Sequence, residues 1–347
     1  MTFVFLSATS SSKATLLSYE GFDYTPGDSI VGQNGGSGFS EPWQPNGNGG
    51  TATNQATSLS YTDAQGNRLV TLGGSLFLQG STMDATNSAA AQPNRLLSYV
   101  RGTNGTDDTT TWVSFLAVRQ GPTTNLPAIP SNPYPRSANL SLFNSLPSNK
   151  EKLAMGNTAL TSNNVVSIIP TGNMTNAKPS TISYSRTNLI VVRIDHIAGT
   201  NFDNAYLFVN PLLGSEPTLS QADTNSLGAF DFSFNRIRPF AGGDRSTSAG
   251  SPYAELVLDE IRIGTTYADV APFVSAPVLG TPSVNGTNVT LNWSAMVNAS
   301  YELQSNTNLG TTNWLTVTNV IATSTNLSVN VIVPPNDPQR FYRVRTP

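Results

Sequence analysis

Hydrophobic and polar residues alternate with a period of two along much of this chain, the spacing that puts successive side chains on opposite faces of a β-strand. The pattern is clearest in residues 188–211, which read as a hairpin around a loop at 199–204. One face of its first strand carries Ile190, Val192, Ile194 and, at the end, His196. We predict that this face is buried and that a more polar face carries Arg193, Asp195, Tyr206 and Asn210.

Other segments extend the same pattern. Residues 109–119 (TTTWVSFLAVR) are almost continuously apolar, which predicts a central strand buried on both faces. Residues 68–72 and 75–79 flank Gly73 and Gly74, which predicts a second hairpin. Residues 228–240 alternate again, and 254–272 (AELVLDEIRIGTTYADVAP) read as the strand that closes the domain. Many short strands without a long helix predict an all-β fold, a large antiparallel sandwich.

After residue 272 the chain becomes rich in Val, Pro and Ser, and five short strand-like runs follow, separated by Asn-, Thr- and Pro-rich turns. This spacing predicts a small immunoglobulin-like sandwich. We therefore expect an N-terminal segment at 1–16, a large sandwich at 17–273 and a second domain at 274–347. The first segment has the apolar run and small residues of a truncated secretory signal, although a sheet-edge start fits equally well.

Composition excludes several classes of function. Charged residues make up 11% of the chain and the net charge is −3, so there is no basic cluster for nucleic acid. With no cysteine and with His196 as the single histidine, neither a disulfide framework nor a thiolate or His-rich metal site is expected. No apolar run reaches the roughly 18 residues of a membrane span. Ser, Thr, Asn and Gly supply the polarity instead.

Several runs resemble known modules. LLSYEGFDYTPGDSIVGQNGGSGFSEPW, WVSFLAVR, VVRIDHIAGTNFDNAYLFVNP and LVLDEIRIGTTYADV resemble concanavalin A-like (LamG-like) jelly rolls of large secreted proteins of Verrucomicrobia and Planctomycetes. VTLNW, YELQSNTNL, TTNWLTV and PQRFYRVR resemble the fibronectin type III-like repeats at the ends of many of those proteins. The resemblance implies a secreted or cell-surface protein, and it leaves lectins, adhesion modules, hydrolases and lyases all open.

No paired-carboxylate motif of a glycoside hydrolase is apparent in the sequence. Asp259 and Glu260 are the densest acidic positions of the closing strand. They are expected to be structural, either pairing with Arg262 or accepting hydrogen bonds from loop amides. For an enzyme, the best candidates are Arg193, Asp195, His196 and Tyr206 on the hairpin, although a lone histidine on an apolar face is more often a hydrogen-bonded anchor.

Sugar binding needs an aromatic platform with polar side chains beside it. Trp43, Tyr206, Arg193, Asp195 and Asn210 could supply both. The other tryptophans, Trp112, Trp293 and Trp314, stand in apolar strands and are expected in the cores. The LamG resemblance also implies a Ca²⁺ site, for which the loop residues Asp203, Asp231 and Asp244 are the candidate ligands.

These observations lead to one main hypothesis and two alternatives. The main hypothesis is a secreted glycan-binding or adhesion protein whose partner is a polysaccharide or surface glycan. The first alternative is a polysaccharide-active enzyme, a glycoside hydrolase or lyase, with its site on the concave face of the jelly roll. The second is a structural subunit of a surface layer or filament, because sparse charge and exposed sheet edges would favour self-association.

Overall fold

The computed structural model describes residues 15–45, 49–81, 90–102, 109–120, 136–145, 150–157, 164–199, 202–243, 253–333 and 339–346. The chain divides into two compact units, and the larger comprises residues 1–61 and 71–271. Residues 62–70 belong to the smaller unit together with 272–347. Within the described ranges, no helix is both long and apolar enough to cross a membrane.

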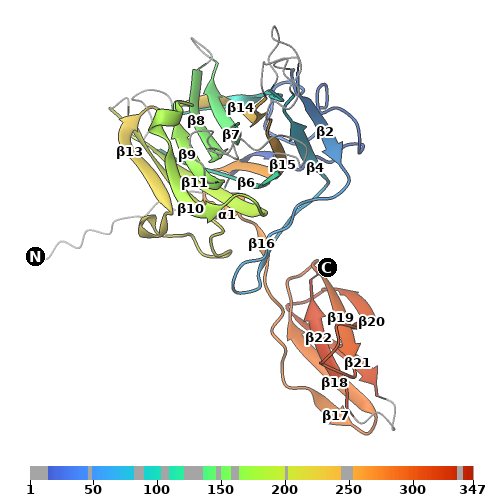
Figure 1. The fold of residues 1–347 in the computed structure, drawn as a ribbon. Helices are drawn as coiled ribbons and strands as arrows, with labels where there is room; N and C mark the ends of the chain where they lie inside the picture. The colour runs from blue at the N-terminus through green and yellow to red at the C-terminus, as the bar shows by residue number, and fades with distance from the viewer. Residues whose placement is uncertain are drawn as a thin grey trace, which may run out of the picture. The chain divides into compact units, whose positions relative to one another are not determined.

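The larger unit is an antiparallel β-sandwich, as the alternation predicts (Figure 1). One layer is an eight-stranded sheet in the order β13-β12-β11-β6-β15-β4-β2, with β1 also paired to β15. Its strands are β13 (Thr224–Phe230), β12 (Asp203–Val209), β11 (Asn188–His196), β6 (Thr109–Gln120), β15 (Glu255–Gly264), β4 (Ser75–Gln79), β2 (Thr51–Gln55) and β1 (Leu16–Glu20).

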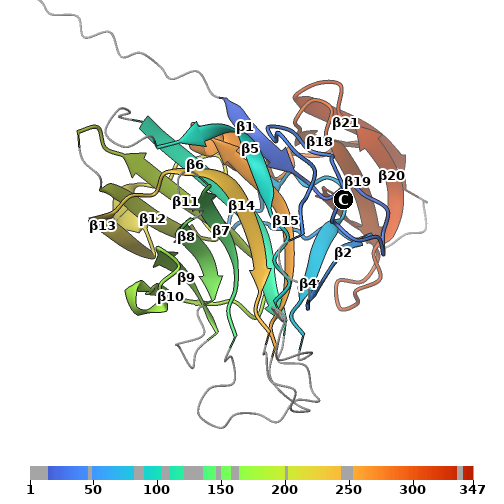
Figure 2. The same ribbon diagram turned by 90° about the horizontal axis from the view of Figure 1, so that it is seen from above.

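The second layer is a six-stranded sheet in the order β10-β9-β8-β7-β14-β5. Figure 2 shows β7 and β14 in this layer, and β6 and β15 in the other. Its strands are β10 (Lys178–Ser183), β9 (Val165–Pro170), β8 (Lys150–Asn157), β7 (Ala138–Asn144), β14 (Phe234–Ala241) and β5 (Arg95–Arg101). In the part of the chain that the structure describes, three short helices lie outside the sheets: η1 (Met174–Asn176), η2 (Leu219–Gln221) and α1 (Tyr267–Val270).

The inward faces of both sheets form one continuous hydrophobic core. Val113, Phe115 and Ala117 of β6 face Leu140 and Leu142 of β7 across it, and all five are fully buried. The burial of alternate side chains in β6 and β11 follows from their period-two sequences. The predicted central strand is therefore confirmed, with β6 between β11 and β15.

The N-terminal loops are held by a buried ion pair. Glu20 accepts hydrogen bonds from Arg95 at 2.7 Å, from the Trp43 indole at 3.0 Å and from the Tyr24 hydroxyl at 2.8 Å. The Arg95 guanidinium lies 4.1 Å from the centre of the Phe39 ring. Aromatic residues of the Gly-rich segment thus fasten it to the sandwich, because every polar tip finds a buried partner.

One predicted hairpin does not form. β4 pairs with β2 and β15, and no strand runs from 68 to 72 to pair with it. Instead β3 (Arg68–Leu69) pairs with β16 (Phe273–Val274) in the smaller unit. Gly73, at a φ of +78°, turns the chain away from β4, and an added Cβ there would come 2.4 Å from the carbonyl oxygen of Gly21.

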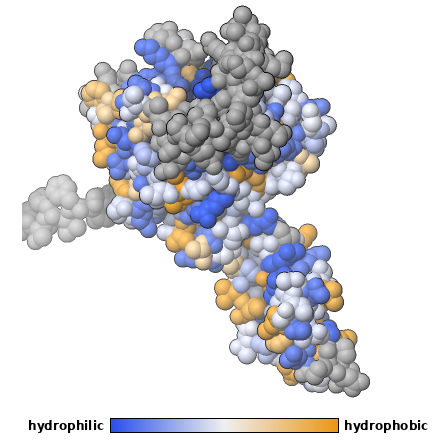
Figure 3. Space-filling view, viewed as in Figure 1, coloured by the Kyte–Doolittle hydropathy of each residue, from blue (hydrophilic) through white to orange (hydrophobic). Residues whose placement is uncertain are grey.

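Besides the β3–β16 pair, the described part of the smaller unit contains two three-stranded antiparallel sheets. Their strands are β17 (Ser283–Asn285), β18 (Asn288–Ser294) and β21 (Asn326–Ile332) in one sheet, and β20 (Leu315–Ile321), β19 (Ser300–Asn306) and β22 (Phe341–Arg345) in the other. Trp293 and Tyr301 pack edge to face at 6.5 Å in its core. Hydrophobic residues also reach its surface (Figure 3), among them Val284, Leu315, Ile321 and Ile332.

Candidate functional site

The outer face of the six-stranded sheet carries a row of charged side chains. In β14 the inward residues include Ile237 and Ala241, which are fully buried, so Arg236, Arg238 and Phe240 point outward. The alternation in FNRIRPF sets this arrangement locally. Both arginines are partly exposed, Arg236 to 22% and Arg238 to 15%.

Arg238 forms the first of two ion pairs on this face. Its guanidinium lies 3.2 Å from a carboxylate oxygen of Glu151 in β8, and the Ser141 hydroxyl donates to the other oxygen at 2.5 Å. The guanidinium also lies 4.3 Å from the Phe143 ring centre and 5.0 Å from that of Phe240. Burial lowers the pKa of Arg238 from its ordinary value, and the Glu151 carboxylate opposes this effect.

A glycine makes room for Glu151. Gly172 has a φ of +62°, and an added Cβ there would lie 2.3 Å from the second carboxylate oxygen of Glu151. A larger residue would therefore push that oxygen out of its position beside Arg238. The carboxylate is fixed from three sides, by Ser141, Arg238 and the Gly172 turn.

Arg236 forms the second ion pair, with Glu41, at 3.3 Å. The same Glu41 oxygen accepts a hydrogen bond from the backbone N–H of Leu96 at 3.1 Å, and Arg236 also donates to Asn94. Glu41 thus approaches from the β5 side, whereas Glu151 approaches from β8 across β7. Two carboxylates from distant parts of the chain flank the same two arginines.

The strands between these pairs carry small and polar residues. Ser141 of β7 pairs in register with Ala154 of β8, and Asn139 pairs with Gly156. Next to them, Lys152 forms a further ion pair with Asp231 at 2.5 Å. The Nε atoms of Arg236 and Arg238 have no hydrogen-bond partner among the described residues. Both Nε atoms are buried, so the partly exposed parts of these charged side chains are what a ligand rich in hydroxyl groups could reach.

The sequence patterns did not single out this face. Lys150, Glu151 and Lys152 are a run of three charged residues in the sequence, and they begin strand β8. A signal was present nonetheless. Polar residues alternate with apolar ones both in β14 and in β7, where Asn139 and Ser141 alternate with Leu140 and Leu142. Only the pairing of β7 with β14 brings the two patterns together.

The predicted hairpin exists as β11 and β12, with Arg193 paired in register with Tyr206. Arg193, Asp195 and Tyr206 do share one face, the outer face of the eight-stranded sheet. Arg193 forms an ion pair with Asp195 at 2.8 Å, and its guanidinium lies 5.6 Å from the Trp112 ring centre. Its second partner, Glu216, is 3.3 Å away and half exposed.

His196 and Asn210 do not join them. His196 is buried on the core side, where one ring nitrogen contacts the Thr111 hydroxyl at 3.0 Å and the other the Asp203 carboxylate at 3.3 Å. Asn210 adopts a φ of 57°, exchanges hydrogen bonds with the Leu189 backbone and donates its side-chain amide to Asn188. Both side chains anchor the hairpin, and neither faces Arg193.

Trp43 cannot serve as the predicted sugar platform. Its side chain is fully buried, packs on Phe22 at 6.2 Å between ring centres, and donates its indole N–H to Glu20. An aromatic platform needs one ring face open to the ligand. The structure therefore corrects the expected role of Trp43.

Of the predicted metal ligands, Asp203 and Asp231 are each engaged by other side chains. Hydrogen bonds from His196 and the Phe232 backbone outweigh the effect of burial and lower the pKa of Asp203. Asp231 is engaged by Lys152 and Ser233, and Asp244 lies outside the described residues. The described part of the chain contains no group of three His, Cys, Asp or Glu residues that could hold a metal ion.

The acidic pair of β15 is structural, as expected from the sequence. A bulge with Glu260 at a φ of 55° interrupts the register between Asp259 and Arg262. Asp259 accepts hydrogen bonds from the Leu59 N–H at 2.8 Å and from Ser58, and Glu260 pairs with Arg262. Burial raises the pKa of Asp259 to about 8.

Comparisons with known proteins give no family for this chain. No family model and no curated protein matches the sequence. Among solved structures, an endo-β-1,4-glucuronan lyase of the fungus Trichoderma reesei has a TM-score of 0.41 at 14% identity, covering 72% of this chain and 99% of its own. An endo-1,3-β-glucanase of Streptomyces sioyaensis has a TM-score of 0.40 at 13% identity, covering 75% and 99%. A putative β-glucanase of Mycobacterium abscessus reaches 0.36 at 11% identity, covering 72% and 100%.

Proposed function

We propose that this chain is a polysaccharide-active enzyme whose substrate lies across the outer face of the six-stranded sheet. The observation that carries the proposal is the pair of outward arginines, Arg236 and Arg238, each ion-paired with a glutamate from a different segment. The solved structures similar to this chain are named as glucanases and a lyase of polysaccharides. These names agree with the proposal, but its basis is the two ion pairs.

The two glutamates stand on opposite sides of the arginine pair. Glu41 approaches over β5 and Glu151 over β8. Glycoside hydrolases place two carboxyl groups about 5 to 9.5 Å apart on the two sides of the scissile bond.

The roles follow from this arrangement. One carboxyl group gives its proton to the glycosidic oxygen as the bond to the anomeric carbon breaks, and the other carboxylate takes a proton from the attacking water. Glu41 and Glu151 are the groups we assign to these roles. Arg236 and Arg238 hold the carboxylates in place and offer their remaining N–H groups to sugar hydroxyls.

Glycan binding without cleavage is the second candidate, and one observation favours it. Both glutamates are already engaged by arginine, and Glu151 also accepts from Ser141, so they could act only as hydrogen-bond acceptors for hydroxyl groups. We also propose that the protein is secreted or attached to the cell surface, and that its smaller unit is a fibronectin III-like module.

A panel of polysaccharides tests both candidates in one assay. The protein is incubated with neutral β-glucans and with uronic acid polymers, and new reducing ends and absorbance at 235 nm are followed, because hydrolysis gives the first signal alone and elimination gives both. Glu151→Gln and Glu41→Gln should each lower the rate at least about 100-fold. Glu216→Gln, a half-exposed glutamate beside Arg193, is the matched control and should leave the rate unchanged.

Three results decide between the readings. Cleavage that falls in both site variants supports the enzyme. Retention of protein on an insoluble polymer without cleavage, lost in the same variants, supports the binding protein. If neither cleavage nor binding depends on Glu41 or Glu151, the outer face of the six-stranded sheet is not the site.

A further inference from the structure

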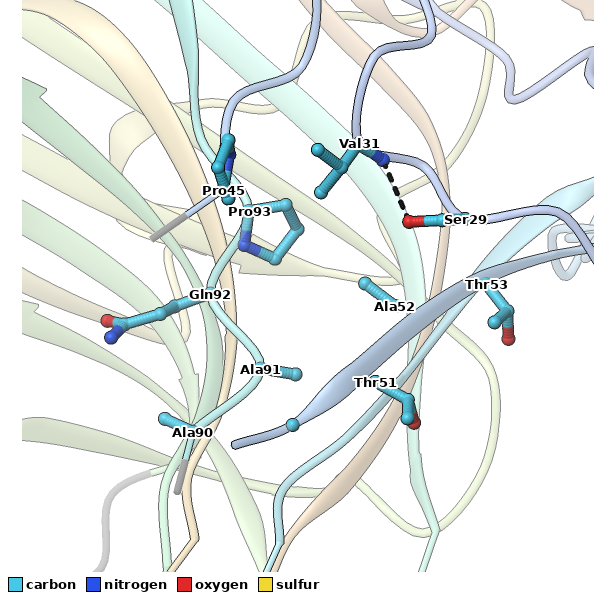
Figure 4. Close-up of a pocket in the computed structure, with 11 residues that line it drawn as sticks. Ser29, Val31, Pro45, Thr51, Ala52, Thr53, Ala90, Ala91, Gln92 and Pro93 are labelled. Atoms are coloured by element: carbon cyan, nitrogen blue, oxygen red, sulfur yellow. Dashed lines mark hydrogen bonds between the residues drawn. The ribbon is translucent and has the colours of Figure 1, made fainter. Parts of the chain in front are cut away.

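A pocket opens beside the candidate site, at the edge of the sandwich where the two sheets separate. Its volume is about 250 Å³, and it lies between β2 and the segment formed by residues 90–93 (Figure 4). Figure 4 shows the methyl groups of Ala52 and Ala91 facing this space, whereas Thr51 and Thr53 project from the other side of β2. Two different sheets thus supply its walls.

Backbone hydrogen bonds fix both walls of the pocket. Ala52 accepts from the backbone N–H of Ile30 at 3.1 Å, and Ala91 exchanges two bonds with Ala241 at the end of β14, each 2.9 Å. Gly50 lets the walls approach, because an added Cβ there would lie 2.3 Å from the backbone nitrogen of Ala91. The pocket is therefore preformed, and a ligand need not order it.

The lining selects for an uncharged ligand. Val31, Pro45 and Pro93 give apolar surface, and among the described residues that line the pocket there is no Asp, Glu, Lys, Arg or His. Ser29 accepts a hydrogen bond from the Val31 N–H at 3.2 Å, which leaves the hydroxyl proton of Ser29 to donate. An ionised group would lose its hydration here without finding a counter-charge, which is costly.

The pocket adjoins the Arg–Glu pairs through one side chain. Gln92 lines the pocket, and its Oε1 accepts a hydrogen bond from Arg238 at 3.4 Å. Arg238 in turn binds Glu151. A chain-like substrate lying over Arg238 can therefore continue past Gln92 into the pocket.

We infer that this pocket is a subsite for one uncharged sugar ring of the polysaccharide, an inference that rests on the proposed function of the neighbouring face. The volume is below the range of about 300 to 1,000 Å³ of sites for drug-sized ligands, and it fits a single ring. The ring's C–H faces pack on Val31 and the two prolines, and its hydroxyl groups reach Ser29 and the pocket's backbone groups. The substrate thus extends beyond the bond that is cleaved.

The test uses oligosaccharides of defined length. Binding of β-1,3- and β-1,4-linked glucose oligomers of two to six units is measured by calorimetry for the wild type and for Ala52→Leu, which fills the pocket. In the wild type one added unit should tighten binding about tenfold, as expected for about 1.4 kcal/mol. Ala52→Leu should remove that step and leave the affinity for shorter oligomers unchanged. Val31→Ala, at a wall residue that is 42% exposed, should weaken the same step several-fold.

Controls separate this inference from the proposed function. Ala229→Leu makes the same substitution at an exposed position of β13 and should reproduce the wild-type length profile. Thermal unfolding shows whether Ala52→Leu is folded, and Val31→Ala gives a second variant if it is not. The subsite is overturned if the wild type shows no gain in affinity with oligomer length, including the case in which no oligomer binds. It is also overturned if both variants keep the gain. Loss of polymer cleavage in Glu151→Gln would then still support the proposed function.

Discussion

The outer faces of the two sheets in the larger unit differ sharply, although similar alternating sequences build both. On the eight-stranded sheet, Trp112, Leu116 and Phe208 are almost fully buried. The Tyr267 ring of α1 packs edge to face on Trp112 at 5.4 Å. On the six-stranded sheet, Arg236, Arg238, Glu41 and Glu151 keep between 15% and 27% of their side-chain surface.

The difference shows that alternation alone does not identify a functional face. Outward residues of β6 are apolar because a helix and loops cover them, and outward residues of β14 are charged because they meet solvent. Buried charges on the covered face, such as Glu260 with Arg262, serve the fold. We therefore expect substitutions on the covered face to change stability, and those on the charged face to change activity.

The largest effect on stability is expected for Arg262→Met. It leaves the Glu260 carboxylate buried without its cation, which should cost about 3 to 5 kcal/mol of unfolding free energy. Arg236→Met makes the same change on the charged face, where solvent reaches the pair, and should cost about 1 kcal/mol or less. Urea denaturation of both variants measures the loss of unfolding free energy, and equal losses would contradict the difference between the two faces.

The next effect concerns pH and Asp259. The pKa of Asp259 is about 8 in the folded state, above its value in the unfolded chain. At a pH between these two pKa values, Asp259 is protonated in the folded state and ionised in the unfolded state. Stability from this group is present at low pH and is lost as pH rises toward 8. In the wild type this group should lower the unfolding free energy by up to about 1.4 kcal/mol per pH unit between pH 5 and 7, and Asp259→Asn should remove that dependence on pH. Parallel curves for variant and wild type would contradict this assignment.

A smaller effect is expected at the helix that covers the eight-stranded sheet. The Tyr267 hydroxyl donates to the Leu212 carbonyl at 2.7 Å. Tyr267→Phe keeps the ring on Trp112 and removes only this bond, which should lower the unfolding free energy by about 1 kcal/mol. Polymer cleavage should not change. A loss of cleavage in a folded Tyr267→Phe protein would bring the covered face into the reaction.

The smallest effect is expected for Asp195→Asn, at the rim of the same sheet. The ion pair of Asp195 with Arg193 is partly exposed, so its loss should change the unfolding free energy by about 1 kcal/mol or less. Cleavage rates should equal those of the wild type. If Asp195→Asn abolishes cleavage while Glu151→Gln does not, the site belongs on β11 and β12.

The buried sides of β6 and β11 were predicted from the sequence, because burial imposes its period on each strand separately, whereas the hairpin predicted at residues 68–79 does not form. The structural role of Asp259 and Glu260 was predicted from the absence of a paired-carboxylate motif. Trp293 proved to be a core residue, whereas Trp314 is only partly buried, with the Arg343 guanidinium 4.3 Å from its ring centre. The candidate site could not be predicted, since it joins Glu41 to β14 and Glu151 to β14 across large sequence separations. The sequence also could not show which outer face helix α1 covers, because that depends on packing between distant segments.

Hydrogen exchange with and without a bound polysaccharide tests most directly which face carries the function. A polymer that the protein binds or cleaves in the panel is added to the Glu151→Gln variant if the wild type degrades it, or to the wild type otherwise. The account predicts slower exchange in β7, β8 and β14, with β11 and β12 unchanged. Protection confined to β11 and β12 would contradict it and would return the site to the Arg193 hairpin.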